Sequence, residues 1–498
     1  QWGVWVGVAS PLSVVSTTTG DIRVSGDSST YLGSKTNRGG LVLWGAQVSS
    51  ETGDISLQGA TKNNGVPSGP ETYGAVVGWS SGENTVSTSG TVSIESGPNS
   101  WVDLQRMTIR ATTELKILTD NIRLGGGTAS LLSDNIVMDE ANGSTPGSAR
   151  LTIPSGVTIQ AASKNVSIGS DSVGQVSIAN RLSVSGQVSL RGQNVSVSAE
   201  VHSGGNSPSV TMIADALEIT SKVRAAVGEI NVSANTTNRG ILLGGSTTSP
   251  LMRVNAGSLA FAESQTLRVG LPGTANIYIG GDLNLTGVSN FVLRSAGNVL
   301  ALNSAKIVVA NLAVNSGGAI DLGGGNEIPG NVALSAPTNA GGVSFSSSVS
   351  YSAAVVDGLT PVFGVGKAVS LTNSPTTEQA NEFLAVTFNP PPQVQITDDY
   401  NKVLDGNNRT AYTYTLSASV ASGSGVVQGL TSSSRVGGLV TFNALRVTSG
   451  VGVYAFTFSA EISPILTLTT RSVDYTVMAG EPGQLQVIAS TTSAQAGK

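Results

Sequence analysis

The fold is decided by one stretch of sequence, NVSIGSDSVGQVSIANRLSVSGQVSLRGQNVSV, at residues 165–197. A second stretch, at residues 266–300, repeats its order of features as TLRVGLPGTANIYIGGDLNLTGVSNFVLRSAGNVL. Both read strand, glycine, short loop, strand, strand, Leu-Arg, glycine, strand. Such self-similarity marks repeat folds, in which each unit buries its apolar face against the next. Strand onsets lie about 8–12 residues apart, which predicts roughly 20–25 residues per coil.

Short segments of alternating apolar and polar residues occur on either side of these blocks. Each puts two apolar side chains on one face and small polar ones on the other, which is the strand period. A glycine precedes each, and we expect it to supply the positive φ that tight corners demand. The segments are residues 21–25, 54–58, 91–95, 175–178 and 229–233, preceded by Gly20, Gly53, Gly90, Gly174 and Gly228.

The composition of the 498-residue chain fits such a coil. Only 11% of the residues are charged, 62 are glycine, none is cysteine, and the formal net charge is −5. The recurring Val and Ile are not typical of a disordered chain. No block of Lys and Arg stands out, so we expect no nucleic-acid partner. No apolar run reaches the roughly 18 residues of a membrane-spanning helix, so we expect none.

We therefore predict an all-β protein whose residues 1–385 form a parallel β-solenoid. A β-propeller fits less well, because its blades carry aromatic signatures and residues 110–260 contain no aromatic residue. The end of a solenoid needs a cover that prevents edge-to-edge pairing. Residues 374–384 are expected to supply it as a helix near 375–384, with Ser374 as N-cap, Pro375 at the first position and Glu378 in the first turn.

The sequence beyond residue 385 has a different texture. Three prolines at 390–392 predict a stiff linker. Residues 386–480 are expected to form an Ig-like β-sandwich without a disulfide. Residues 481–498 are read as a linker and the first strand of a further domain or a donor-type tail. The expected sandwich strands lie at residues 393–396, 412–416, 439–442, 453–458 and 473–477.

Candidate chemistry is sparse, and we expect no catalytic residue, no cofactor and no metal site. His202 is the only histidine, and without cysteine any triad or zinc site would depend on it alone. Asp21 and Asp54 follow corner glycines, so we expect them to bond local backbone groups. Residues 398–407 are read as an Asp- and Asn-rich hairpin rather than a calcium loop. Residues 317–322 carry only half of a calcium-binding nonapeptide.

All five tryptophans lie at or before position 101. On an exposed face they would stack on sugars or fill an interface, and at the N-terminal end of a solenoid they would pack as a plug. We favour packing. The tryptophans are Trp2, Trp5, Trp44, Trp79 and Trp101.

The repeat region resembles that of filamentous-haemagglutinin-like bacterial exoproteins. The matching residues are 239–244 (RGILLG), 267–270 (LRVG), 276–279 (NIYI) and 292–299 (VLRSAGNV). The later segment resembles bacterial Ig-like repeats at residues 394–398, 438–442 and 452–456. The resemblance implies a right-handed β-helix followed by an Ig-like domain, with a role in adhesion or cell-surface assembly, and it identifies no binding residue.

Together these patterns predict a non-catalytic, secreted surface protein, either an adhesin or a fibre protein, that forms a stiff stalk. Self-association into filaments and a surface glycan or protein ligand are the expected partners. The alternatives are a carbohydrate-active enzyme on a β-helix, of the polysaccharide lyase or hydrolase kind, and a viral fibre protein. The enzyme predicts clustered charged residues in a groove, and the sequence offers no obvious cluster.

Overall fold

The computed structural model describes most of the chain up to residue 478. The described ranges are 2–7, 13–27, 39–60, 76–78, 83–98, 100–123, 128–141, 144–161, 165–206, 208–245, 250–337, 342–349, 351–362, 368–373, 378–379, 385–387, 391–397, 414–423, 426–428, 432–435, 439–443, 445–448, 452–462, 466–471 and 474–478. The chain divides into two compact units. Unit 1 holds residues 1–349 and 354–360, and unit 2 holds residues 350–353 and 361–498.

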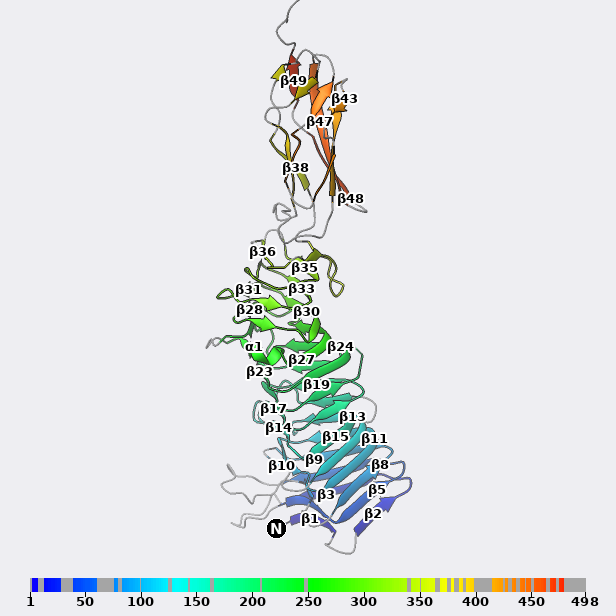
Figure 1. Cartoon of the computed structure of the whole chain (residues 1–498). Helices are drawn as coiled ribbons and strands as arrows, with labels where there is room; N and C mark the ends of the chain where they lie inside the picture. The colour runs from blue at the N-terminus through cyan, green and yellow to red at the C-terminus, as the bar shows by residue number, and fades with distance from the viewer. Residues whose placement is uncertain are drawn as a thin grey trace, which may run out of the picture. The chain divides into compact units, whose positions relative to one another are not determined.

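The structure is 59% strand and 1% helix, so the prediction of an all-β chain with long parallel sheets is confirmed. One sheet of unit 1 has fifteen strands, and neighbouring strands run parallel (Figure 1). In spatial order they are β1 (Trp2–Gly7), β4 (Gly39–Trp44), β7 (Val76–Gly78), β10 (Trp101–Asp103), β12 (Asn121–Arg123), β14 (Arg150–Ile153), β17 (Gln175–Ile178), β20 (Asn194–Val197), β23 (Ala216–Ile219), β26 (Met252–Val254), β25 (Ile241–Leu243), β28 (Ile277–Ile279), β31 (Val299–Ala301), β34 (Ile320–Asp321) and β36 (Val343–Ser344).

The second sheet of unit 1 consists of two adjoining parallel ladders. The first ladder contains β2 (Ser13–Thr17), β5 (Ala46–Ser50), β8 (Asn84–Thr88), β15 (Val157–Ala161), β18 (Leu182–Val184) and β21 (Val201–Ser203). The second contains β3 (Ile22–Asp27), β6 (Ile55–Ala60), β9 (Thr91–Ser96), β16 (Asn165–Ile168), β19 (Val188–Arg191), β22 (Val210–Ile213), β30 (Val288–Ser295), β33 (Asn311–Ser316) and β35 (Asn331–Ser335). Four long strands belong to both: β11 (Met107–Leu118), β13 (Ala129–Asp139), β24 (Val223–Ser233) and β27 (Ala262–Val269).

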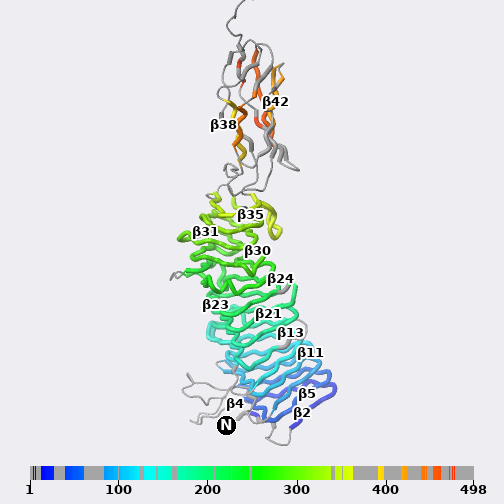
Figure 2. The backbone as a smooth tube through the Cα atoms, viewed as in Figure 1, coloured from blue at the N-terminus to red at the C-terminus, as the bar shows by residue number. Residues whose placement is uncertain are grey.

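The register of the second ladder gives the length of each step along the chain. Ile22 pairs with Ile55 and Ile55 with Val92, so the first steps are 33 and 37 residues long. Val166 pairs with Val188 and Val188 with Val210, so later steps are 22 residues long. The predicted step of 20–25 residues therefore holds for the middle of unit 1 and fails for its first coils. The tube in Figure 2 shows these segments stacked along the unit.

The two repeated sequence blocks occupy equivalent positions in the ladders. In residues 165–197 and again in 266–300, the first strand lies in the second sheet and the next in the first sheet. Each block also ends its first strand on a glycine of positive φ, Gly169 at +86° and Gly270 at +84°. A Cβ there would lie 2.0 Å from the Arg191 carbonyl oxygen and 2.2 Å from that of Arg294 respectively. The Leu-Arg pair of each block therefore passes directly over the glycine of its own block.

The corner glycines of the predicted strands are required for a reason other than the predicted one. None of Gly20, Gly53, Gly90, Gly174 and Gly228 has a positive φ. A Cβ on Gly53 would instead lie 2.2 Å from the carbonyl oxygen of Gly20, and one on Gly174 would lie 2.1 Å from that of Gly147. Stacked corners bring backbone against backbone, and only a residue without a side chain fits there.

The core of unit 1 lies between the sheets and consists of the inward residues of successive strands. In β9, Val92 and Ile94 are fully buried and alternate with half-buried polar neighbours, as the period-2 pattern predicts. Similar alternation holds in β6, β17 and β19. At about 1.5–3 kcal/mol for each fully buried aliphatic side chain, these stacked residues supply the main stabilising term.

One step of unit 1 departs from the regular order. Strand β25 precedes β26 in the chain, yet β26 lies between β23 and β25 in the sheet. The short helix α1 (Ala256–Leu259) follows β26, with Asn255 as its N-cap. The buried hydroxyl of Ser258 in α1 accepts a hydrogen bond from the Ile219 amide at 3.0 Å. This backward step accounts for the 37-residue spacing between Ile230 and its partner Leu267.

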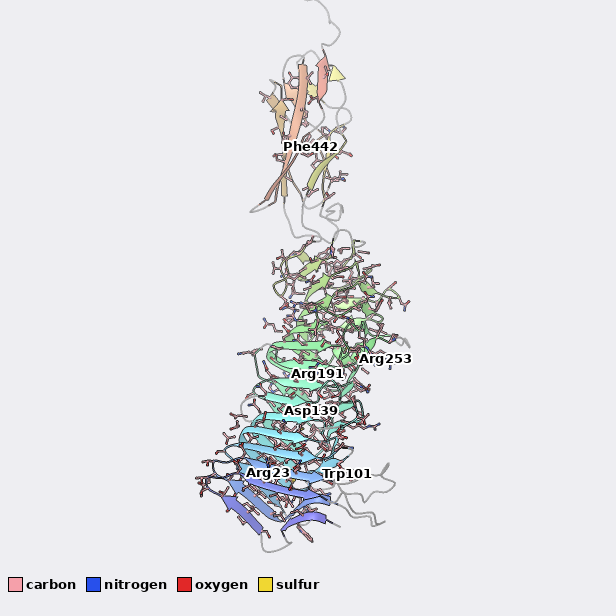
Figure 3. All side chains as sticks on the ribbon, turned by 180° about the vertical axis from the view of Figure 1, so that it is seen from behind. Arg23, Trp101, Asp139, Arg191, Arg253 and Phe442 are labelled. Atoms are coloured by element: carbon pink, nitrogen blue, oxygen red, sulfur yellow. The ribbon has the colours of Figure 1, made fainter. Side chains whose placement is uncertain are left out.

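Small ladders complete unit 1, and antiparallel pairs dominate unit 2. The remaining pair of unit 1 is β29 (Leu283–Asn284) with β32 (Ile307–Val308). The strands of unit 2 are β37 (Ser352–Ala353), β38 (Ala368–Asn373), β39 (Glu378–Gln379), β40 (Ala385–Thr387), β41 (Gln393–Thr397), β42 (Tyr414–Ser422), β43 (Val426–Gln428), β44 (Ser432–Arg435), β45 (Leu439–Thr441), β46 (Arg446–Thr448), β47 (Gly452–Ile462), β48 (Leu466–Arg471) and β49 (Tyr475–Met478). The core of unit 2 includes Phe442, labelled in Figure 3, whose ring centroid lies 5.2 Å from that of Phe458.

Two expectations near the unit boundary are wrong. The predicted helix is absent at Glu378–Gln379, which instead form β39 and pair with β49. Residues 374–377 and 380–384 lie outside the described residues. Strand β38 pairs with β41 of unit 2, so the second unit begins well before residue 386. The alternating Ala368, Ser370 and Leu371 region finds its partner in a neighbouring antiparallel strand, and pairing overrides the local helix signals.

The prolines at 390–392 do not separate two units. They lie between β40 and β41, both strands of unit 2, and the Pro392 carbonyl oxygen accepts a hydrogen bond from the Phe442 amide at 2.9 Å. The five strands predicted between residues 393 and 477 are found as β41, β42, β45, β47 and β49. Residues 481–498 lie outside the described part of the chain.

Candidate functional site

The corner aspartates bond backbone groups of the next coil, as expected. The Asp21 carboxylate accepts a hydrogen bond from the Asp54 amide at 2.9 Å. The Asp54 carboxylate in turn accepts one from the Thr91 amide at 2.7 Å. Each carboxylate thus satisfies a backbone donor that the turn leaves unpaired. These residues hold coils together and form no paired catalytic site.

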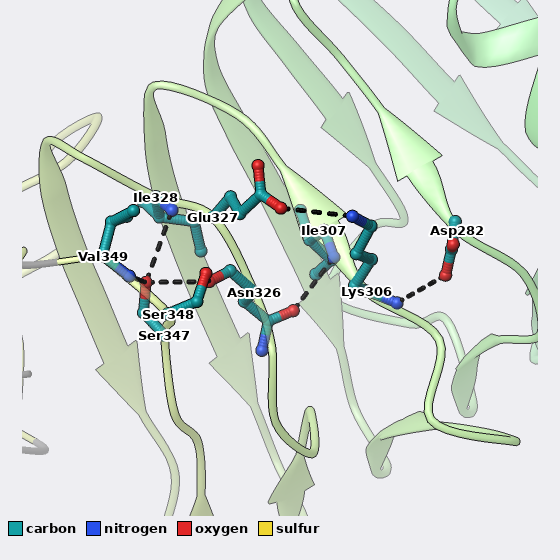
Figure 4. Close-up of polar contacts among 9 residues, drawn as sticks. All are labelled: Asp282, Lys306, Ile307, Asn326, Glu327, Ile328, Ser347, Ser348 and Val349. Atoms are coloured by element: carbon teal, nitrogen blue, oxygen red, sulfur yellow. Dashed lines mark hydrogen bonds and ion pairs between the residues drawn. The ribbon is translucent and has the colours of Figure 1, made fainter.

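Asparagine takes over this role further along unit 1. The Asn276 side-chain oxygen accepts from the Asn298 amide at 2.8 Å, and that of Asn298 accepts from the Ala319 amide at 2.8 Å. A buried variant occurs at Asn326, whose side-chain oxygen accepts from the Ile307 amide at 2.9 Å (Figure 4). The same figure shows Lys306 bridging two coils, with its amide bound to Asp282 at 3.0 Å and its ammonium to Glu327 at 3.1 Å. Side-chain ladders therefore reinforce the backbone ladders at the corners.

The most buried ionic cluster surrounds Arg268 in β27. Its guanidinium binds both carboxylate oxygens of Glu229, at 2.9 and 2.7 Å, and the carboxylate of Asp357 at 2.7 Å. Glu229 raises the pKa of Arg268 most, by hydrogen bonding, so the guanidinium stays charged. Asp357 lies 89 residues away in the chain and adopts a φ of +50°. This cluster fastens residues 354–360 to the outer face of the second sheet.

Apolar residues support the same attachment. The outward residues Val292, Ala313 and Ala333 follow Arg268 along one row of the ladder. They are nevertheless buried, because Val356 packs against them and Leu359 joins the cluster. Val356 and Leu359 also form a short antiparallel bridge. The segment thus covers an apolar end of an otherwise polar row.

A second group of charged residues lies on the outer face of β18, β21, β24 and β27. The register places Ser183 beside His202, His202 beside Arg224, and Arg224 beside Glu263. The row next to it begins with Arg181, Glu200 and Lys222, one residue earlier in each strand. Arg181 binds Glu200 at 3.3 Å, and Glu263 binds both Lys222 at 2.5 Å and Arg224 at 2.7 Å. We call these seven residues the charged face.

A polar groove of about 430 Å³ opens beside the charged face. His202, Arg224 and Glu263 line it together with Ala225, Ser264, Gln265, Gly287 and Ser289. The hydrogen bond from Lys222 lowers the pKa of Glu263 below its ordinary value, and Arg224 adds a smaller effect against partial desolvation. Glu263 is therefore a carboxylate at neutral pH, held between two cations.

Two further depressions in unit 1 are mainly polar. One of about 470 Å³ is lined by Lys116, Asp139, Glu140 and serines of neighbouring coils. Another of about 650 Å³ lies over β20, β23 and β26 and includes Asn194, Glu218 and Arg253. Asp139 and Arg253 are labelled in Figure 3. Neither brings together a nucleophile with a base.

The remaining residues singled out from the sequence have structural surroundings where they are described. His202 contacts only the Ser183 hydroxyl, with its Nδ1 at 3.4 Å. Trp101 is buried in β10, and Trp44 is half-buried in β4, in agreement with packing. The Asp321 carboxylate accepts from the Gly323 amide at 3.1 Å. The side chains of Trp2 and Trp5, all of Trp79, and residues 398–407 lie outside the described residues.

The charged face was not found from the sequence. Its residues are spread over positions 181–263, and only the parallel register brings them into adjacent rows. Across the described residues, no group of three or more His, Asp or Glu side chains is placed to hold a metal ion. No helix among the residues described has the length and apolar character to cross a membrane. No known family model matches the chain, and no curated protein matches its sequence.

Proposed function

We propose that unit 1 is a right-handed parallel β-solenoid, that unit 2 is an Ig-like β-sandwich, and that the chain serves as a non-catalytic extracellular surface protein. The observation that carries this proposal is the in-register parallel ladder from Ile22 to Val332. A strand–crossover–parallel-strand connection within one sheet is almost always right-handed, which favours that hand. A continuous stack of short rungs resists bending and suits a stalk.

The chemistry of the described residues supports a structural or adhesive role. The carboxylates with the strongest contacts are bound by cations, as in Glu229 with Arg268 and Glu263 with Lys222. The corner carboxylates Asp21 and Asp54 are bound by backbone amides. These acids stabilise stacking, and a low charge with many exposed hydroxyl and amide groups suits display at a surface. An adhesin or a fibre component fits this arrangement best.

Electron microscopy of the purified protein tests the proposal. In dilute solution we expect isolated rods, and at high concentration either the same rods or end-to-end filaments. Rods alone assign a stalk, and filaments assign a fibre component. Compact particles without an elongated part would contradict both. Antibody labelling of intact, unpermeabilised source cells tests location, since surface labelling is expected and its absence would contradict the extracellular role.

A further inference from the structure

The charged face differs from the rest of the second sheet in charge and in chemistry. Its outward residues include three permanent cations, Arg181, Lys222 and Arg224, against two carboxylates, Glu200 and Glu263. The chain as a whole is acidic, with a net charge of −5. A locally positive surface on an acidic protein attracts anionic groups and keeps its own carboxylates occupied.

Arg224 is the residue best placed to receive an anion. Its Nε is engaged with Glu263, and its terminal nitrogens have no described partner. The side chain is 50% exposed and lines the groove together with His202 and Gln265. A guanidinium presents its donors in a planar fork that matches a carboxylate. The groove also offers the hydroxyls of Ser264 and Ser289 as donors and acceptors.

Phe261 adds an apolar surface at the same place. It precedes β27, and its carbonyl oxygen accepts a hydrogen bond from the Val223 amide at 3.0 Å. Ala262 is buried, so alternation along the strand puts Phe261 and Glu263 on the same outer face. Phe261 is 39% exposed and is the one aromatic among the large apolar side chains found exposed in the described residues. An exposed ring beside polar groups suits a ligand with one apolar and one polar side.

We propose that the charged face binds an acidic sugar unit of a glycan, with the sugar carboxylate on Arg224 and the apolar face of the ring on Phe261. The inference rests on the proposed adhesive function, for which it supplies the ligand class. Strands β18, β21, β24 and β27 are each paired on both sides, so an extended peptide finds no free backbone edge here. An excess of one positive charge is too small for a nucleic-acid surface.

Calorimetry with the full chain tests the proposal. The probes are the tetramer of galacturonic acid, its methyl ester, and a tetraglutamate peptide. We expect saturable binding of the tetramer and at least tenfold weaker binding of the ester, because the ester lacks the carboxylate. Arg224→Gln and Phe261→Ala are each expected to weaken binding by about tenfold. Lys222 still holds Glu263 in the Arg224 variant.

The matched control is Arg23→Gln. Arg23 is an exposed outward residue of β3 in the same sheet and is labelled in Figure 3. We expect its substitution to change the affinity by less than about twofold. Three results would overturn the proposal: no binding of the tetramer at about 5 mM, equal affinity for tetraglutamate, or an equal loss in the Arg23 variant. Electron micrographs of the same sample report separately on the stalk, so its failure and the failure of this site are distinguishable.

Discussion

Replacing Gly53 by alanine should damage the stack, whereas the same change at Gly20 should not. Both glycines follow a hydroxyl residue at the same corner. The Gly20 amide donates to the Thr17 hydroxyl at 3.2 Å, and the Gly53 amide donates to the Ser50 hydroxyl at 2.9 Å. A Cβ on Gly53 would lie 2.2 Å from the Gly20 carbonyl oxygen, whereas one on Gly20 has its nearest neighbour at 3.4 Å. Neither residue has a positive φ, so crowding alone separates the two.

The magnitude follows from that crowding. Overpacking against backbone costs about 1–3 kcal/mol, while glycine-to-alanine in compatible backbone stabilises by about 0.4–1 kcal/mol through the unfolded chain. We therefore expect Gly53→Ala to destabilise and Gly20→Ala to be neutral or slightly stabilising, a difference of about 2–4 kcal/mol. Because stacked repeats open locally, hydrogen exchange in peptides covering residues 46–60 is the suitable assay, with peptides over 188–203 as an internal reference. Equal exchange in the two variants would refute the stacked-corner argument.

Three further predictions concern side-chain contacts. Arg268→Met should destabilise by about 3–5 kcal/mol, because it leaves the Glu229 carboxylate buried and unpaired, and Asp357→Asn by about 1 kcal/mol; denaturant unfolding that ranks them in reverse would contradict the cluster. Asn326→Ala should lower stability by about 2–4 kcal/mol, since the side chain donates to the Leu322 and Ser346 carbonyls and accepts from Ile307; an unchanged melting temperature would disprove its role. The lowered pKa of Glu263 means that its ion pairs stabilise the fold above the unfolded-state pKa of about 4.3 and lose this effect as pH falls through the folded value; a Glu263→Gln variant should lose little further stability over that range, and an identical pH profile of the two proteins would contradict the pairing.

Much of the fold could be predicted from local pattern. Val92 and Ile94 alternate with polar residues, and such alternation is enough to place a strand and its buried face. The parallel stacking was suggested by the repeated blocks, whose glycines and Leu-Arg pairs have equivalent positions. The reason for the corner glycines was missed, because close approach between coils depends on residues more than 30 positions apart.

Other features depend on long-range pairing that local signals do not contain. The Ser-Pro and Glu signals near 374–378 favour a helix, but Glu378–Gln379 gain more from pairing with β49. The backward step of β25 and β26 has no local signature, since either strand is a plausible neighbour of β23. The charged face likewise required the register. His202 alone suggested an ordinary loop residue, whereas Arg224 and Glu263 acquire a role only when placed beside it.

The most direct test of the parallel stack is a distance measurement between spin labels along one outer row. The chain contains no cysteine, so pairs can be introduced without other changes. Ser56 and Ser189 lie 133 residues apart in the chain but five register steps apart in the row, through Ser93, Lys116, Val137 and Ser167. At about 4.8 Å per step the backbone separation is about 24 Å, and for the pair Ser93 and Ser189 it is about 19 Å. Narrow distributions near these values, differing by one step, are predicted. Broad distributions, or centres beyond about 40 Å, would contradict the stack.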